Sequence, residues 1–140
     1  MVRAPAVAMT PNPAVLVGLR ATDDLEGDLE GWVQRLGFET RVSTSAREVR
    51  AWLGQGDYAA SFVDSDLGLA EGEAIWRTLR PPVARRTVLL TRDRRRDLWF
   101  EALRAGMATV LTLPLHETTV HAAIEAVVGR SGAGPRTSTR

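Results

Sequence analysis

The sequence predicts one α/β domain in which helices cover both faces of a parallel β-sheet. Short apolar runs alternate five times with segments whose apolar residues recur at helical spacing, with about twenty residues per repeat. Runs without polar alternation are typical of strands that are buried on both faces. Because crossovers between parallel strands are right-handed, helices should pack on both sides of the sheet. We therefore expect a three-layer, doubly wound (βα)5 domain.

The expected strands are the five short apolar runs. Each run has the length of a strand rather than that of a core helix. The third run begins at Tyr58, stops abruptly at Asp64 and is followed by a loop sequence that contains glycine. The strands are therefore expected at residues 14–19, 38–42, 58–64, 87–91 and 108–113.

Each expected helix is marked by an apolar stripe together with residues that begin or end helices. Thr22 or Asp23 can cap the first stripe, which runs over residues 25–36 and is ended by a glycine. The third helix is expected to stop at Pro81-Pro82, because a residue that precedes proline disfavours the helical conformation. The later stripes cover residues 49–53, 74–79, 98–103 and 120–128.

The two ends of the chain differ in composition from the rest. Residues 1–13 are rich in Ala and Pro, and residues 129–140 consist mainly of Gly, Ser, Thr and Arg. Such compositions are typical of chain that does not fold. We therefore expect a disordered segment at 1–13, the domain at 14–128, and a disordered tail or linker at 129–140.

The composition excludes several kinds of chemistry. There is no cysteine, which excludes disulfides, thiolate nucleophiles and thiolate metal ligands. All 18 basic residues are arginine, which excludes Schiff-base chemistry on lysine. The formal net charge of +1 provides no general attraction for nucleic acid or membranes. No stretch has the length of a membrane span and no signal-peptide h-region follows the N-terminus, so we expect a cytoplasmic protein.

One group of residues follows the carboxyl ends of the predicted strands. Ligands of open α/β sheets bind beyond this edge, and Asp64 lies there because it ends a buried run. The alternative is that Asp64 only begins a turn, as aspartate often does. The other residues expected at this pocket are Arg20, Ala21, Asp66, Thr91, Leu113 and Pro114.

This set of positions resembles the receiver domain of two-component response regulators, the CheY-like family. The resemblance extends over about residues 14–128 and implies a flavodoxin-like sheet with strand order 2-1-3-4-5. In it, Asp64 matches the phospho-accepting aspartate, Thr91 the hydroxyl residue that ends the fourth strand, and Pro114 the proline of a Lys-Pro pair. Gly72 and Ala105-Gly106 match further family positions. The resemblance implies a signalling module that is not an enzyme.

The departures from the family pattern concern the groups that hold Mg²⁺ and phosphoryl oxygens. Arg20-Ala21 stands where the family has an acidic pair, and Leu113 stands where it has lysine. Mg²⁺ prefers oxygen ligands such as carboxylates and neutralises charge during phosphoryl transfer, so a guanidinium should repel it. We therefore expect a degenerate receiver, or pseudo-receiver, with no cofactor, weak or absent Mg²⁺ binding, and neither catalytic nor metal-ligating residues. Asp23-Asp24 is an alternative acidic pair.

Arg20 suggests a substitute for the metal. Its planar guanidinium can form an ion pair with the carboxylate of Asp64 and so hold the pocket in one state. The alternative is that Arg20 points into solvent.

Two surfaces are candidates for partner binding. In the family, the face formed by the fourth helix, the fifth strand and the fifth helix binds targets or a second copy of the chain. Here that face carries Trp99, Leu103 and Val110, and tryptophan is enriched at binding hot spots. The second candidate is the arginine-rich segment 92–96, either as a nucleic-acid patch or as a solvated face with internal Arg–Asp pairs. No DNA-binding motif accompanies this segment, so nucleic acid is not the expected partner.

We expect a regulatory or scaffolding module that acts through protein partners, with a homodimer as one form and without membrane contact. The first alternative is an active receiver that a histidine kinase phosphorylates on Asp64. The second alternative is a nucleic-acid-associated regulator that uses residues 92–96.

Overall fold

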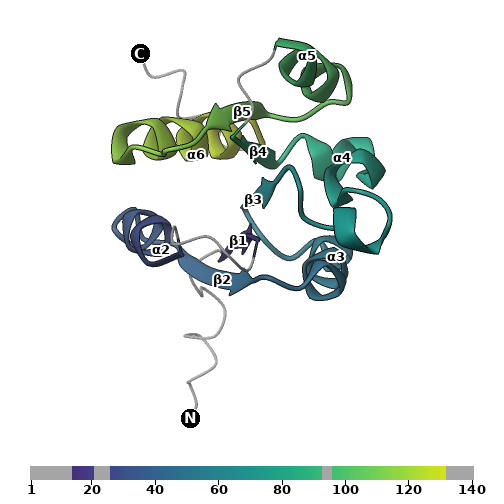
Figure 1. The fold of residues 1–140 in the computed structure, drawn as a ribbon. Helices are drawn as coiled ribbons and strands as arrows, with labels where there is room; N and C mark the ends of the chain where they lie inside the picture. The colour runs from purple at the N-terminus through teal and green to yellow at the C-terminus, as the bar shows by residue number, and fades with distance from the viewer. Residues whose placement is uncertain (1–13, 21–25, 93–95, 132–140) are drawn as a thin grey trace.

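The computed structural model describes residues 14–20, 26–92 and 96–131, which form a five-stranded sheet between two layers of helices (Figure 1). All four strand pairs are parallel, and the strand order is β2-β1-β3-β4-β5. The fold class and the strand order that the sequence predicts are therefore confirmed. The strands are β1 (Ala14–Gly18), β2 (Glu39–Ser43), β3 (Ala60–Asp64), β4 (Thr87–Thr91) and β5 (Thr109–Thr112).

The helices form one layer on each face of the sheet (Figure 1). The first layer consists of α2 (Glu26–Gln34) and α6 (Glu117–Ser131), and the second of α3 (Ala46–Gln55), α4 (Pro81–Ala84) and α5 (Arg96–Arg104). Apolar clusters fill both interfaces. Because β1, β3 and β4 are buried along their whole lengths, they are the apolar runs that the sequence marks most clearly.

Two buried hydroxyl groups link the central strands. The Oγ atom of Ser61 in β3 lies 2.8 Å from Oγ1 of Thr87 in β4. Thr87 Oγ1 donates its own hydrogen to the carbonyl oxygen of Val83, also at 2.8 Å, so Ser61 must be the donor to Thr87. These two consecutive hydrogen bonds satisfy both hydroxyl groups inside an otherwise apolar layer.

The segment between β3 and β4 differs from the prediction. Instead of one helix that stops at Pro81-Pro82, it has the 3₁₀ turns η1 (Leu69–Glu71) and η2 (Ile75–Thr78), followed by the short helix α4. The prolines begin α4 rather than end a helix, because proline lacks an N–H group and its fixed φ suits the first helical turn. Only short helical turns therefore cover the sheet between α3 and α5.

Gly68 makes the turn between β3 and η1 possible. Its φ is +101°, a left-handed conformation that side chains disfavour. A Cβ atom at this position would lie 2.6 Å from the carbonyl oxygen of Glu73 and 3.0 Å from the amide nitrogen of Ile75. This contact is sterically forbidden, so both backbone conformation and space require glycine here.

The predicted end of the last helix can be compared with the structure, whereas other predicted ends fall outside the described residues. Helix α6 continues to Ser131, so residues 129–131 belong to a helix and not to the tail. The predictions for residues 1–13 and 132–140, for the caps Thr22 and Asp23, and for the Asp23-Asp24 alternative lie outside the described residues. Within the part of the chain that the structure describes, no helix has the length and hydropathy needed to cross a bilayer.

Candidate functional site

Asp64 lies at the carboxyl edge of the sheet and is completely buried, with 0% of its surface exposed. Its Oδ1 atom accepts the backbone N–H of Asp66 at 2.8 Å. Its Oδ2 atom contacts Nη1 of Arg92 at 3.1 Å. The buried carboxylate therefore has both a hydrogen-bond donor and a positive charge beside it, as a buried charged group requires.

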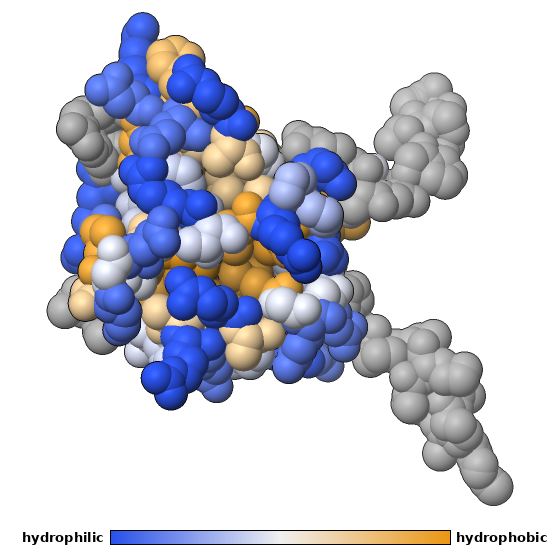
Figure 2. Space-filling view, turned by 90° about the vertical axis from the view of Figure 1, so that its right-hand side faces the viewer, coloured by the Kyte–Doolittle hydropathy of each residue, from blue (hydrophilic) through white to orange (hydrophobic). Residues whose placement is uncertain are grey.

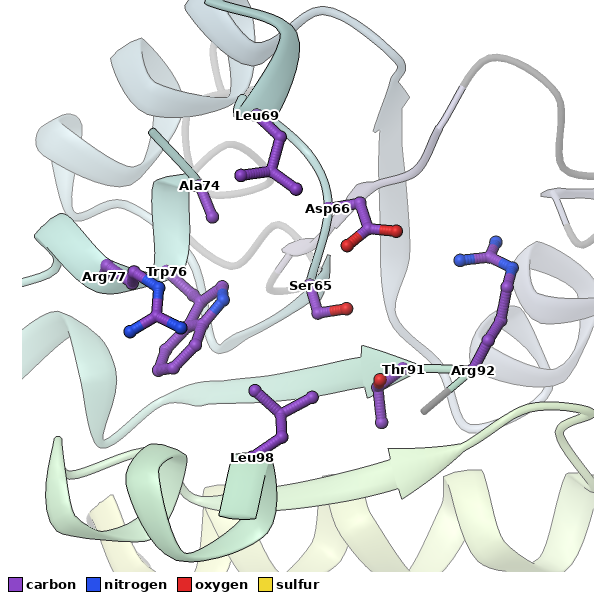
Figure 3. A pocket seen from close by; sticks show the side chains of 9 residues that line it. All are labelled: Ser65, Asp66, Leu69, Ala74, Trp76, Arg77, Thr91, Arg92 and Leu98. Carbon is purple, nitrogen blue, oxygen red and sulfur yellow. The ribbon is translucent and has the colours of Figure 1, made fainter. Parts of the chain in front are cut away.

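Arg92 reaches Asp64 because β3 and β4 are neighbours in the sheet. The register pairs Asp64 with Leu90, so the residues that follow β4 pass directly beside the aspartate. Thr91 ends β4 at this edge and is buried, as the sequence predicts for a pocket residue. The Arg92 side chain extends from the same strand end, and its guanidinium lies on the side of Asp66 (Figure 3).

The predicted ion pair between Arg20 and Asp64 is wrong. Arg20 Nη1 contacts Oδ2 of Asp66 at 3.2 Å, with both side chains partly exposed, and Arg92 takes the place beside Asp64. The strand register explains the difference, because it pairs Gly18 with Val63. Arg20 thus lies beyond Asp64 along the strand direction, next to the loop that carries Asp66.

The remaining predicted pocket residues lie at different places. The amide of Leu113 donates to the carbonyl oxygen of Thr91 at 2.8 Å, and its side chain packs against the core formed with α2 and α6. Pro114 follows a cis peptide bond and is exposed. Neither residue lines the cavity that opens at this edge of the sheet. Ala21 lies outside the described residues.

A cavity of about 280 Å³ opens between this edge, the two 3₁₀ turns and the start of α5 (Figure 3). We call it the edge cavity. One side is mainly apolar and the other carries hydroxyl and charged groups. Its lining consists of Ser65, Asp66, Leu69, Ala74, Trp76, Arg77, Thr91, Arg92 and Leu98.

The charges around the edge cavity are paired within the protein. Asp64 is paired with Arg92, Asp66 with Arg20, and Arg77 with Glu101 of α5. The hydrogen bond from Arg77 holds the pKa of Glu101 below its ordinary value, and the same bond raises the pKa of Arg77. Among the described residues, no three His, Asp or Glu side chains are grouped so that they could hold a metal ion.

Helix α5 exposes large apolar side chains on its outer surface. Trp99 and Leu103 are exposed, as predicted for an interaction face, and Phe100 is 58% exposed. The assignment of Val110 to this face is wrong, because only 1% of it is exposed and it packs with Ala102 beneath α5. Apolar surface is visible among hydrophilic side chains on the face covered by α3, α4 and α5 (Figure 2).

Three residues of the two surfaces described above, Arg92, Phe100 and Trp76, were not identified as site residues from the sequence. Arg92 directly follows the fourth predicted strand, so the rule that places ligands at strand ends also applies to it. Phe100 adjoins Trp99 and lies one helical turn before Leu103, so helical spacing predicts a shared surface. Trp76 gave no comparable signal, because only the packing of η2 brings its ring to the edge cavity.

Known structures define the class of this fold. The receiver domain of a Francisella response regulator is 18% identical to this chain, with a TM-score of 0.73, and covers 86% of this chain and 99% of its own length. The receiver domain of a sensor histidine kinase from Pseudomonas aeruginosa, whose active-site cleft holds a magnesium ion, gives 16% identity and a TM-score of 0.68 over 84% of this chain and 98% of its own. The chain therefore has the fold of CheY-like receiver domains.

A third similar structure shows a receiver domain with a partner. The receiver domain of a Saccharomyces cerevisiae response regulator, seen in complex with a histidine phosphotransfer protein, is 14% identical over 86% of this chain and 92% of its own, with a TM-score of 0.67. No protein-family model matches the sequence, and no curated protein matches it. The likeness to known proteins thus lies in the fold.

Proposed function

We propose that this chain is a pseudo-receiver, a cytoplasmic receiver-like module of signal transduction that acts through protein contacts without Mg²⁺-dependent phosphorylation of Asp64. One observation carries the proposal: the guanidinium of Arg92 lies 3.1 Å from the buried carboxylate of Asp64. In an active receiver, a metal ion and a phosphoryl group must approach this carboxylate. Here a side chain of the protein already neutralises it.

Charge supports weak or absent Mg²⁺ binding. A divalent cation between Asp64 and Asp66 would meet two guanidinium groups, Arg92 and Arg20, each in contact with one of these acids. A pair of unit charges about 4 Å apart is worth roughly 4 kcal/mol at an effective dielectric constant near 20. Mg²⁺ would have to displace both arginines before it gained these ligands, and it requires near-octahedral oxygen coordination.

The test is the intact mass of the protein after incubation with Mg²⁺ and acetyl phosphate. We expect no phosphoryl adduct on the wild-type chain. Asp64→Asn is the control that locates any adduct, and Arg92→Ala tests whether the guanidinium is what blocks the site. An adduct on the wild type that disappears in Asp64→Asn would refute the proposal and favour an active receiver with a cognate histidine kinase.

We further propose that the outer surface of α5 binds a protein partner with an apolar and acidic surface. Trp99, Phe100 and Leu103 are exposed together, and helical spacing places Arg96 among them. Large exposed apolar groups of this kind mark contact sites. Arg96 can pair with an acidic side chain of the partner, and a homodimer through the same surface is the alternative.

A synthetic amphipathic helix with leucine and glutamate on one face is a suitable probe for this surface. We expect it to bind more weakly as salt is raised, and to lose binding in Phe100→Ser, while a matched peptide with lysine in place of glutamate does not bind. Sedimentation equilibrium provides the alternative outcome. Concentration-dependent dimers that Phe100→Ser abolishes would replace the acidic partner with a second copy of the chain.

The nucleic-acid alternative depends on the arginines of residues 92–96. The side chain of Arg92 turns inwards to Asp64, and residues 93–95 lie outside the described residues. Salt-dependent binding to DNA or RNA, measured with the same variants, would favour this alternative because phosphate contacts release counterions.

A further inference from the structure

The edge cavity presents two hydrogen-bond donors that the described part of the protein does not use. Trp76 is 2% exposed and Ser65 is 8% exposed, and both residues line the cavity. Among the described residues, the indole N–H of Trp76 and the hydroxyl group of Ser65 make no hydrogen bond, and neither atom is enclosed in the core. Both donors are therefore available to a molecule that enters the cavity, where it would replace water as their acceptor.

The positions of the two groups suit one small ligand. Figure 3 shows the indole nitrogen on the edge of the Trp76 ring that faces Ser65. Indole N–H only donates and a serine hydroxyl can donate, so both favour an acceptor oxygen. A carbonyl oxygen has two lone pairs and can receive both donors.

Shape and hydropathy define the rest of the ligand. The side chains of Leu69, Ala74 and Leu98 form apolar parts of the wall. The volume of about 280 Å³ equals that of about nine water molecules at liquid density, close to the lower limit of small-molecule pockets. A compact molecule with a short aromatic or aliphatic body would fill it.

The charges of the lining favour a neutral ligand. Each charged group at the cavity, namely Asp66, Arg77 and Arg92, already has an oppositely charged partner in the protein. An ionised ligand would lose hydration without gaining an unmatched countercharge, and a carboxylate would also be repelled by Asp66. A neutral amide or ketone avoids both costs.

We propose that the edge cavity binds a small neutral molecule with a carbonyl acceptor on a short apolar body, held by Ser65 and Trp76. The proposal goes beyond the pseudo-receiver function, because it assigns the pocket a ligand of a different chemical class from a phosphoryl group or a metal ion. The ligand would contact Leu69 of η1, Trp76 of η2 and Leu98 of α5 together. Occupancy would thus join the 3₁₀ turns to the helix that carries the exposed aromatic surface.

Benzamide and benzoate are matched probes, since they share the ring and differ in charge. The chain has four tryptophans, whose indole N–H signals can be resolved by ¹H–¹⁵N NMR and assigned with Trp→Phe variants. We expect benzamide to produce a saturable shift that is largest for Trp76, and benzoate to bind at least tenfold more weakly. No saturable Trp76 shift up to the solubility limit, or equal affinities for the two probes, would overturn the proposal.

Variants distinguish hydrogen bonding from general affinity for aromatic rings. By calorimetry, Ser65→Ala and Trp76→Phe should each weaken benzamide binding about tenfold, because each removes one hydrogen bond to a buried acceptor. Trp52→Phe in α3 is the control and should leave the affinity unchanged. Equal losses in Trp52→Phe and Trp76→Phe would contradict the site. Because these titrations contain neither Mg²⁺ nor acetyl phosphate, their outcome is independent of the phosphorylation test.

Discussion

Arg92→Ala tests the ion pair on which the proposed function rests. The substitution leaves the carboxylate of Asp64 buried with 0% exposure and removes its cationic partner at 3.1 Å. Loss of one partner from a fully buried pair costs about 3–5 kcal/mol. The Arg92 side chain is 34% exposed, so solvent screens part of this interaction, and the N–H of Asp66 still supports the carboxylate. We therefore expect a loss of about 2 kcal/mol in unfolding free energy at neutral pH.

The assay is urea unfolding of a double-mutant cycle. In the Asp64→Asn background the charge is gone, so Arg92→Ala should cost less than about 0.5 kcal/mol, which leaves a coupling free energy of about 1.5 kcal/mol. Thermal unfolding should show a decrease of about 8 °C for the single variant, at about 4 °C per kcal/mol for a domain of this size. Arg96→Ala is the matched control, because Arg96 is exposed at the start of α5. If Arg92→Ala cost as much in the Asp64→Asn background as in the wild type, the ion-pair argument would be refuted.

Three further predictions concern the fold. Gly68→Ala should destabilise the protein by about 1–3 kcal/mol in urea unfolding, because φ at this position is positive and the space for a Cβ atom is filled. Gly31→Ala in α2 has open space around it and should stabilise the protein by about 0.5–1 kcal/mol. The reverse order of the two stabilities would contradict the steric argument. Thr87→Val should cost about 1–3 kcal/mol because it leaves the buried hydroxyl donor of Ser61 without its acceptor, whereas the carbonyl oxygen of Val83 keeps the N–H of Arg86. Ser61→Ala should cost less because Thr87 keeps its own acceptor, and equal costs would refute the assigned donor order. Burial raises the pKa of Tyr58, the only tyrosine, so the tyrosinate absorbance of the folded protein should appear at a pH above the ordinary pKa of about 10. Because Tyr58 then loses its proton in the unfolded state first, the free energy of unfolding should fall as the pH rises above about 10. An ordinary titration of the folded protein would contradict this assignment.

The sheet could be predicted because its signals are local. Buried strands of a parallel sheet are continuous apolar runs, and the central strands β1, β3 and β4 are such runs. The rule that strand ends carry function identified Asp64 and Thr91 correctly as residues of this edge. Side-chain pairing was less predictable, because both Arg20 and Arg92 follow neighbouring strands, and only the register decides which guanidinium reaches Asp64.

Two sequence predictions, the helix end at Pro81-Pro82 and the exposure of Val110, were wrong because both depend on how the elements pack in three dimensions. Pro81-Pro82 ends helices in many sequences and begins them in others, and here the chain turns so that the prolines occupy the first turn of α4. The family pattern places Val110 on the surface, but its side chain lies on the sheet face that α5 covers. Sequence spacing gives the face of a strand and not what packs on it.

The 3₁₀ turn η1 differs from the elements beside it in how little it buries. None of its residues is buried, whereas η2 buries Ile75 and Trp76, and β3 and β4 are buried along their whole lengths. Because a short 3₁₀ turn with few buried apolar contacts opens at a low cost in free energy, the amide hydrogens of η1 should exchange with solvent long before those of β3 and β4. Leu69 of η1 lines the edge cavity, so local opening of this turn would widen the entrance to the cavity while the sheet stays intact.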